Sequence, residues 1–412
     1  MSSAQTIDRH PAGLIMLLAG LAMFGPFSID TMFPMFGVME KIFGITPVQM
    51  QQTVSVYLLA YGWMSLLHGP LSDAFGRRHV ILVGVAMFTL SSIGCACSTT
   101  IGQLLLFRAL QGFSAGSGLI VGRAIIRDRF HGADAQRIMS RVSMVFAVAP
   151  AIAPIIGGIV GTRWGWAAIF WSLALFSVLL LVCCWRWLPE THPHDNRLPV
   201  ALVPMFQRYG RMLGNPRFTW LAFSCALNFS AIFIVIASAP VIVLNHLRLG
   251  PTDFAYLFIP TISGMTCGAY LSGRRAGRHK PESNIAVAYT GMFAAGLINV
   301  AYCTLAPRYA LPWAVVPIFA LGMGVSLAFP TLTLLLLDLY PQERGTASSM
   351  QTFIQLMIST LIAGVVSPAL AAHPAHMALG SISCTLIGWG CWNMAKRAGV
   401  MSSPEMAMVP AK

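Results

Sequence analysis

The sequence predicts an all-helical membrane protein with twelve transmembrane helices. Of its 412 residues, 56% are hydrophobic and only 9% are charged, whereas a soluble globular chain carries about 25% charged residues. So few charges cannot cover the water-facing surface of a chain of this size, which excludes an ordinary soluble enzyme. At about 20 residues per membrane span plus short loops, the chain has room for about a dozen helices.

The apolar residues form twelve runs separated by short polar loops. A backbone in lipid must satisfy its hydrogen bonds within each span, so the runs are predicted to be helices. The first run is too long for a signal-peptide core and is predicted to be a retained helix. The predicted spans are 13–39, 52–72, 80–98, 102–126, 136–160, 166–188, 217–244, 252–273, 284–304, 312–337, 346–371 and 376–396.

A polar stretch near the middle of the chain divides these spans into two sets of six. Residues 189–216 contain five prolines and are too short to form a domain, so they are predicted to be a cytoplasmic linker. The linker separates an N-terminal six-helix bundle, 1–188, from a C-terminal six-helix bundle, 217–412. Two such halves joined by a central loop are a known transporter plan.

The distribution of basic residues predicts the orientation. With the N-terminus inside, the outer loops hold only Lys41, Arg163, Arg248 and Arg308. Cytoplasmic loops are enriched in Lys and Arg, so both termini are predicted to be cytoplasmic. The net charge of +13 is attributed to this bias and to contact with lipids. No nucleic-acid partner is predicted, because the cations are not gathered on one folded face.

The sequence offers no cofactor or metal motif. Nine cysteines are an odd number and cannot all pair, and none has the spacing of a zinc site. The ten histidines lack a His-Glu-x-x-His pattern. No phosphate-binding Walker A sequence is present, so a proton gradient rather than ATP is predicted to supply the energy, with no cofactor.

The loop after the second predicted span carries the strongest motif. Residues 69–82 read Gly-Pro-Leu-Ser-Asp-Ala-Phe-Gly-Arg-Arg-His-Val-Ile-Leu. Glycine permits a positive φ in a tight turn, the acid can complement the N-terminus of another helix, and the arginines can anchor to the inner leaflet or pair with acids. A weaker match to the same motif, Gly268 to Arg278, follows the eighth span. The predicted cytoplasmic gate motif is Gly69, Asp73, Gly76, Arg77 and Arg78.

This loop resembles the signature of the major facilitator superfamily, and further segments narrow the resemblance. Gly25–Pro34 resembles the Gly-Pro…Asp…Pro pattern of drug:proton antiporters, and Arg108–Gly112 resembles the Arg-x-x-Gln-Gly motif of proton-coupled members. Ala149–Gly158 is similar to the antiporter motif. Its two Ala-Pro steps, together with Leu188–Thr191, resemble the bicyclomycin-resistance (Bcr/CflA) branch.

The resemblance implies a fold and an activity. It implies the major facilitator fold and a proton-coupled antiporter of the bacterial inner membrane, which exports drug-like amphipathic small molecules by alternating access. A monomer is expected, because the sequence has no obvious dimer motif and one copy suffices for this mechanism. In the antiporter motif, Pro150, Pro154, Gly157 and Gly158 are implied to bend the fifth span and seal the two halves. Ala22 stands where some multidrug relatives carry a second acid, which disfavours dicationic drugs.

Two charges inside the membrane are predicted to couple transport to protons. Asp30 lies about 13 Å and Arg108 about 9 Å from the same membrane face, at 1.5 Å per helical residue. A charge inside the bilayer costs about 2.5–3.5 kcal/mol to insert, which marks such residues as functional candidates. Burial disfavours a charged carboxylate and a nearby arginine favours it, so alternate opening can load and release a proton at Asp30. A static ion pair is the alternative interpretation.

A substrate cavity is predicted between the halves near the midplane. Polar residues within spans usually face the bundle, although hydrogen bonding between helices is an equal alternative. The candidate lining residues are Tyr57, Tyr61, Asn228, Phe229, Tyr256, Gln351 and Gln355. The same motifs also serve a proton-coupled exporter of an endogenous metabolite such as an amino acid or a sugar, which is the alternative function. An enzyme is disfavoured because no nucleophile motif is present.

Overall fold

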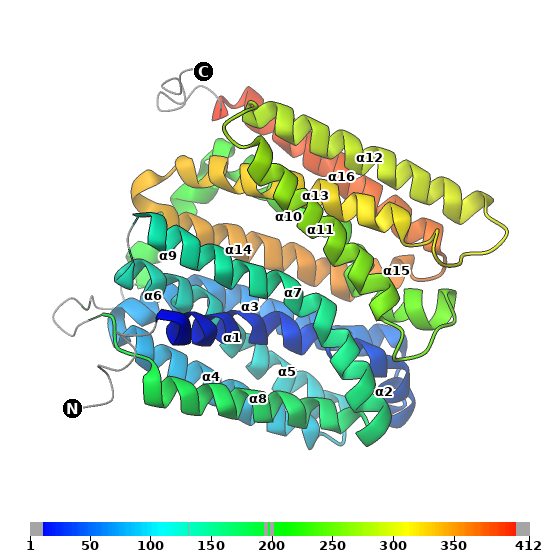
Figure 1. Cartoon of the computed structure of the whole chain (residues 1–412), viewed down its shortest axis with the longest axis horizontal. Coiled ribbons are helices and arrows are strands. Elements are labelled where there is room, and N and C mark those ends of the chain that lie inside the picture. The colour runs from blue at the N-terminus through cyan, green and yellow to red at the C-terminus, as the bar shows by residue number, and fades with distance from the viewer. Residues whose placement is uncertain (1–10, 131, 193–196, 198–201, 401–412) are drawn as a thin grey trace. The chain divides into compact units, whose positions relative to one another are not determined.

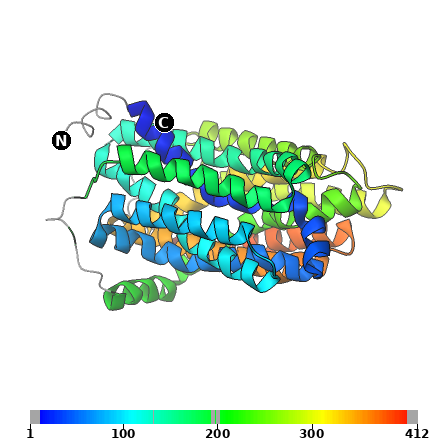
Figure 2. The ribbon, with the colours of Figure 1, turned by 90° about the horizontal axis from the view of Figure 1, so that it is seen from below.

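The computed structural model describes residues 11–130, 132–192, 197 and 202–400, and within them it is helical with no strand (Figure 1). The helices are α1 (Pro11–Asp30), α2 (Phe36–Phe43), α3 (Pro47–Phe75), α4 (Arg77–Ala96), α5 (Ile101–Gly116), α6 (Gly122–Arg129), α7 (Gly132–Trp164), α8 (Trp166–Trp187), α9 (Leu202–Gly214), α10 (Pro216–Ala237), α11 (Ala255–Arg275), α12 (Pro281–Leu305), α13 (Val316–Asp338), α14 (Arg344–Leu361), α15 (Ser367–Leu370) and α16 (Pro374–Arg397). Within each of the two units described below, the helices run side by side as a bundle (Figure 2).

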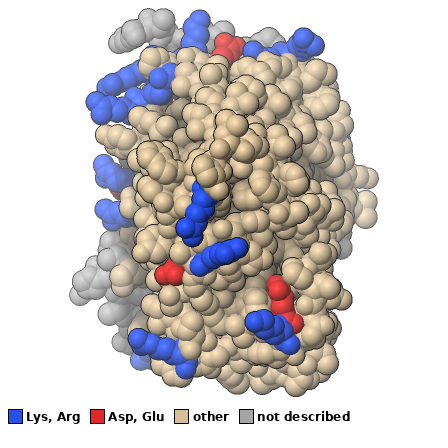
Figure 3. Space-filling model, turned by 90° about the vertical axis from the view of Figure 1, so that its right-hand side faces the viewer, with Lys and Arg blue, Asp and Glu red and all other residues tan. Residues whose placement is uncertain are grey.

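The described residues form nine helical stretches that are long and apolar enough to cross a membrane. The other three predicted spans are also helical, as α3, α11 and α16, but they are not among the nine. On the face shown in Figure 3, which looks onto the ends of the helices, charged side chains form isolated groups and the rest of that face is uncharged. The chain is a multi-pass membrane protein, and the number of twelve spans stays a prediction.

Several of the predicted spans are interrupted by turns that are not α-helical. The first breaks after Asp30 and resumes through a 3-10 turn, Phe33–Met35, whose proline lacks the N–H that an α-helix needs. Wider π-helical turns, which are frequent at functional sites, follow α5 at Ser117–Val121 and α14 at Ile362–Val366. Hydropathy averages over a window and does not register such local breaks.

Contacts between residues divide the chain into two compact units. Unit 1 comprises Met1–Val200 with Ala239–Ile259, and unit 2 comprises Ala201–Ser238 with Pro260–Lys412. Unit 1 therefore takes in Ala239–Ile259, a segment that the predicted limits assign to the second bundle. This segment packs on unit 1 because Gly158 lies against Pro251 and the rings of Phe33 and Phe258 are 6.5 Å apart.

Glycines let the helices of unit 1 approach closely. A Cβ atom added at Gly112 of α5 would overlap the backbone carbonyl of Tyr57 in α3. One added at Gly118 would overlap the carbonyl of Leu21 in α1. These contacts give the two glycines a packing role, since small residues allow close approach of helices in membranes.

Unit 2 is built around α10, which packs on α13, α14 and α16. A buried pair of hydroxyl groups joins α10 to α12, with Ser224 Oγ 3.1 Å from Tyr289 Oη. At the start of α10, Asn215 accepts a hydrogen bond from the backbone N–H of Arg217 and donates one of 3.0 Å to Tyr340 Oη beyond α13. Arg217 also donates to the carbonyl of Ala398, beyond α16. The start of α10 and the ends of α13 and α16 therefore meet at one end of unit 2.

The predicted linker contains a helix that also belongs to unit 2. On α9, Met205, Tyr209 and Met212 are buried, whereas Arg208 and Arg211 face outward. Burial raises the pKa of Tyr209 to about 12, because the charged phenolate loses its solvation there. An amphipathic helix thus attaches the second half of the linker to unit 2.

The contact between α11 and α13 gives a test of packing in unit 2. A Cβ added at Gly264 or Gly268 would overlap the backbone carbonyl of Phe319 or Met323, whereas one at Gly273 of the same helix would meet nothing. We expect Gly264→Val and Gly268→Val each to lower the free energy of unfolding by about 1–3 kcal/mol, the range for overpacking. Thermal unfolding of the purified protein measures the change, and equal losses in Gly273→Val would contradict this packing.

Candidate functional site

Asp30 is the last residue of α1 and lies at the break in that helix. It is 4% exposed, and among the described residues none forms an ion pair or a hydrogen bond with its carboxyl group. The position at a helix C-terminus faces the negative end of the helix dipole. A buried carboxylate with no cation is costly, and protonation removes that cost. The site is therefore suited to a carboxyl group that gains and loses a proton.

Arg108 of α5 is fully buried and binds backbone carbonyl groups of neighbouring helices. Its Nε donates to the Thr53 carbonyl at 3.2 Å and its Nη1 to the Ser28 carbonyl at 3.4 Å. The guanidinium carbon lies 4.4 Å from the centre of the Tyr57 ring, which places the cation over an aromatic face. Nη2 is buried and has no partner among the described residues.

The structure does not show the static ion pair that was the alternative interpretation of Asp30 and Arg108. The guanidinium binds the carbonyl two residues before Asp30 instead of its carboxylate. Spacing along two helices predicted a similar depth for the two residues, but it could not say which groups Arg108 reaches. Whether Arg108 sets the proton affinity of Asp30 stays a prediction.

A hydrogen-bonded chain from α4 holds Arg108 in place. Arg108 Nη1 donates to Gln111 Oε1 at 2.7 Å, and Gln111 Nε2 donates to Ser92 Oγ at 2.8 Å. Cys95 Sγ lies 3.7 Å from the same Gln111 oxygen. Gln111 belongs to the Arg-x-x-Gln-Gly motif, but Ser92 and Cys95 sit in an apolar run with no signal of their own, and sequence reasoning missed them.

The antiporter motif of α7 lies directly against the break next to Asp30. A Cβ added at Gly157 would overlap the carbonyl of Thr31, and one at Gly158 would overlap that of Pro251. Pro150 and Pro154 lie inside the same helix, where each removes a backbone hydrogen bond. Only glycine permits this approach, so the structure brings the motif and the acid together within unit 1.

The candidate cavity residues are divided between the two units. In unit 1, Tyr57 is committed to other contacts, since its hydroxyl donates to the Gly25 carbonyl at 2.8 Å, and Tyr61 packs edge to face on it. Tyr256, also in unit 1, is 56% exposed. Their role in a cavity stays a prediction.

In unit 2 the candidates make contacts within the bundle. Asn228 Nδ2 donates to the Val325 carbonyl at 3.0 Å, while its buried Oδ1 has no partner among the described residues. Gln351 Nε2 donates to Thr333 Oγ1 at 2.9 Å. Phe229 stacks on Phe233, and Gln355 is partly exposed. The free Asn228 oxygen is the one acceptor in this set that still needs a donor.

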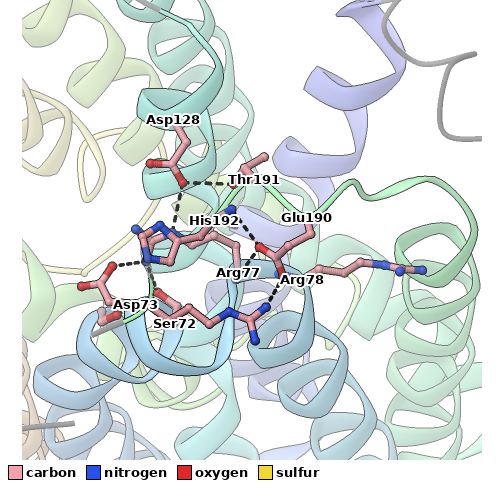
Figure 4. Close-up of polar contacts among 10 residues, drawn as sticks. Ser72, Asp73, Arg77, Arg78, Asp128, Glu190, Thr191 and His192 are labelled. Carbon is pink, nitrogen blue, oxygen red and sulfur yellow. Dashed lines mark hydrogen bonds and ion pairs between the residues drawn. The ribbon is translucent and has the colours of Figure 1, made fainter. Parts of the chain in front are cut away.

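The predicted gate motif forms the turn between α3 and α4 and a network of charges around it (Figure 4). Gly76 has a φ of +94°, which favours glycine. Arg77 lies 2.5 Å from Asp73 and 3.1 Å from Asp128 at the end of α6. The Asp73 carboxylate thus pairs with the first residue of α4, across the turn, and whether it complements a helix N-terminus stays a prediction. Gly69 lies in α3, with open space where a Cβ would be.

Glu190 closes this network from the segment after α8. Its carboxylate accepts hydrogen bonds from the backbone N–H groups of Arg77 at 2.9 Å and Arg78 at 3.2 Å. These are the first residues of α4, so the acid caps the helix and complements its dipole. Thr191 donates to Asp128 at 3.0 Å. The Arg78 guanidinium donates to the Trp185 carbonyl at 2.5 Å, although the sequence predicted a lipid anchor or a partner acid.

Sequence reasoning missed the roles of Glu190 and Asp128. The segment Leu188–Thr191 was noted only as part of a family resemblance, and its partner lies more than a hundred residues away. No group of three or more His, Cys, Asp or Glu side chains in the described ranges could hold a metal ion. All nine cysteines are free thiols.

Comparison with known proteins identifies relatives along most of the chain. The profile of the Major Facilitator Superfamily matches residues 15–364. A bicyclomycin resistance protein homolog of Haemophilus influenzae is 25% identical over 373 residues, which cover 90% of this chain and 93% of that protein. Multidrug resistance protein D of Escherichia coli is 26% identical over 366 residues, with 87% and 89% covered. These matches confirm the resemblance that the motifs indicated.

The fold is shared with a solved transporter structure. The crystal structure of a D-xylose-proton symporter aligns with a TM-score of 0.74 at 14% identity, covering 92% of this chain and 97% of that one. At this identity the likeness concerns the fold alone.

The cap on α4 predicts a loss of stability in Glu190→Ala. Removing a helix cap costs about 0.5–2 kcal/mol, and two backbone N–H groups lose their acceptor here. We expect a lower midpoint in thermal unfolding and a smaller effect in Glu190→Gln, which keeps an acceptor oxygen. Glu282→Ala is the matched control, an acid in the first turn of α12 without a capping hydrogen bond among the described residues. Equal losses in the two alanine variants would contradict the capping role.

The contacts of Arg108 predict that lysine cannot replace it. A single ammonium group cannot reach the Ser28 and Thr53 carbonyls and Gln111 together, whereas the planar guanidinium does. A hydrogen bond to a charged group contributes about 1.5–3 kcal/mol, so we expect substrate-driven proton flux in Arg108→Lys to fall at least about tenfold. Flux in reconstituted vesicles measures this, with Arg211→Lys on the outer face of α9 as the control. Native flux in Arg108→Lys would show that charge alone is enough.

Proposed function

The chain belongs to the Major Facilitator Superfamily, and we propose that this transporter exports drug-like amphipathic molecules in exchange for protons across the bacterial inner membrane. A role in transport and not in catalysis follows from the family. Antiport and drug export rest on two supports. One is the site around Asp30, and the other is that relatives are named for resistance to bicyclomycin and to multiple drugs.

The observation that carries the proposal is the buried, unpaired carboxyl group of Asp30 at a helix break. Protonation stabilises it in a dry environment, and contact with water or with a cation favours its release of the proton. A conformational change that exposes the helix break at Asp30 first to one aqueous side of the membrane and then to the other shifts the carboxyl group between its protonated and deprotonated forms. The same carboxyl group can thus bind a proton on one side and release it on the other, which is the requirement for coupling.

Arg108 provides the cation that such a cycle needs. Its Nη2 is buried without a partner among the described residues, while Nη1 holds the Ser28 carbonyl in the turn of α1 that contains Asp30. A small shift of this turn exchanges a carbonyl contact for a carboxylate contact, which stabilises the deprotonated acid. In this mechanism Gln111 and Ser92 keep the guanidinium in place, and the substrate is released as the proton binds.

The antiporter motif couples this turn to α7. Because Gly157 lies against the Thr31 carbonyl, any movement of the break after Asp30 must be accommodated by α7, which two prolines have already weakened. The proposed orientation, with both termini cytoplasmic, follows from the bias of basic residues. It places the network of Arg77, Asp128 and Glu190 at the cytoplasmic end of unit 1, where it can hold that end closed. The mechanism needs only one copy of the chain, so a monomer is sufficient.

The proposal predicts the loss of coupled proton flux in Asp30→Asn. Everted membrane vesicles are energised, the pH gradient is followed with a fluorescent reporter, and antibiotics and dyes are added, followed by amino acids and sugars. We expect at least one amphipathic drug to collapse the gradient with the native chain and with Glu282→Gln, but not with Asp30→Asn, because asparagine carries no proton. Asp30→Glu, which keeps a carboxyl group, should recover part of the flux.

The outcomes separate the two candidate functions. If only an amino acid or a sugar collapses the gradient, the transporter is an exporter of an endogenous metabolite. Full drug-dependent flux in Asp30→Asn at a fixed pH gradient would refute the role of Asp30. Thermal unfolding of each variant verifies that the compared proteins are folded.

A further inference from the structure

The loop between α11 and α12 shares one backbone feature with the gate turn in unit 1 but not its charges. Gly277 has a φ of +73° and Gly76 a φ of +94°, and each is followed by an arginine. Three residues before the glycine, the first loop has Asp73 and the second has Arg274. An acid in one half is thus replaced by a cation in the other.

In unit 1 the cations of this turn are neutralised by carboxylates. Arg77 pairs with Asp73 and Asp128. The backbone of the same turn is capped by Glu190, which also lies 3.9 Å from Arg197. A cation with two acids beside it has little attraction left for an external anion.

In unit 2 the corresponding cations have no such partners. Arg274, Arg278 and Lys280 are exposed, and among the described residues none of them forms an ion pair with a carboxylate. Arg274 Nη1 donates only to Tyr270 Oη, at 3.4 Å, and Arg275 donates to the neutral Asn284 side chain at 2.8 Å. Within seven residues, 274–280, the loop presents four permanent cations and His279. No carboxylate among the described residues neutralises the exposed cations of this loop.

The loop lies where a membrane surface would meet it. α11 and α12 are successive predicted spans, and their connection falls at the end of unit 2 where α10 begins and α13 ends, which is cytoplasmic in the proposed orientation. One turn before the loop, Tyr270 is 64% exposed and Leu271 is also exposed. Tyrosines are enriched at membrane–water interfaces, with the ring at the level of the headgroups. Arg274 is therefore held by a hydroxyl group at that level.

We propose that the loop 274–280 binds the headgroups of anionic phospholipids in the inner leaflet. Arg274, Arg278 and Lys280 contact phosphate oxygens, and Tyr270 positions Arg274 at the interface. Arginine binds phosphate through two parallel hydrogen bonds, and clusters of four to eight cations next to a span are typical of anionic-lipid binding. The inference rests on the proposed orientation but not on the substrate or on proton coupling. If the basic residues of this loop only set the orientation of the chain in the membrane, their charge would be required but the loop would not bind a lipid.

The test compares unpaired with paired cations. The first variant combines Arg274→Gln, Arg278→Gln and Lys280→Gln. The matched control removes the same charge from three arginines that each pair with an acid, in Arg137→Gln, Arg208→Gln and Arg344→Gln. Their partners are Asp134 at 3.2 Å, Glu343 at 3.9 Å and Asp338 at 2.8 Å. Binding of phosphatidylglycerol and of phosphatidylcholine to the full chain in detergent is measured by native mass spectrometry, with thermal unfolding as a check of the fold.

We expect the loop variant to bind phosphatidylglycerol at least about tenfold more weakly than the native chain, and the control to lose less than about twofold, because cations near anionic lipid contribute individually. Binding of phosphatidylcholine should not change. Arg274→Lys with Arg278→Lys keeps the charge and should keep most of the binding, which excludes misfolding as the cause. Equal losses in the loop variant and the control would overturn the proposal. So would binding of inorganic phosphate or glycerol phosphate as tight as that of the lipid, which would indicate a site for free anions. A failure of antiport alone leaves this measurement unaffected.

Discussion

A buried carboxyl group and a buried guanidinium group that do not pair with each other set the constraint on which the rest of unit 1 depends. Lipid and packed helices offer no water to either, so each must be stabilised by the protein or stay neutral. Arg108 is stabilised by backbone carbonyls of two neighbouring helices, and those helices must approach closely enough to present them. Gly112 of α5 lies against α3, and Gly118 in the turn after α5 lies against α1, so these glycines make that approach possible. Asp30 has no such support, which leaves protonation as the way to neutralise it.

The two halves of the chain use the same turn for different purposes. In unit 1 the turn after α3 is fastened by carboxylates from α6 and from the segment after α8 (Figure 4). In unit 2 the equivalent turn carries a cation in place of the acid, and its charge faces outward. A connection fastened within one unit can hold that unit together. One whose cations have no partner acid can contact the membrane, as proposed for the loop 274–280.

Much of the fold was predictable from the sequence because lipid restricts the choices. Apolar runs of membrane length have to be helices, and each of the twelve predicted spans is helical over most of its length. The positions at which the helices break were harder to predict from the sequence. The sequence did not show that α1 ends at Asp30 itself, or that Gly157, in a helix more than a hundred residues away, lies against the Thr31 carbonyl at this break. Nor did it show that Ala239–Ile259 belongs to unit 1, where Pro251 lies against Gly158.

For the site, the sequence by itself determined which residues carry the chemistry. Asp30 stood out because acids inside spans are expensive, and the motif residues stood out through their fixed spacing. Only the tertiary structure decided what these residues touch. Arg108 binds backbone carbonyl groups. Because every residue has one, the sequence cannot indicate which carbonyl groups will accept these hydrogen bonds. Glu190 caps a helix that begins 113 positions before it. The sequence specifies which side chains are present, but their hydrogen-bond partners depend on how helices far apart in the sequence pack against one another.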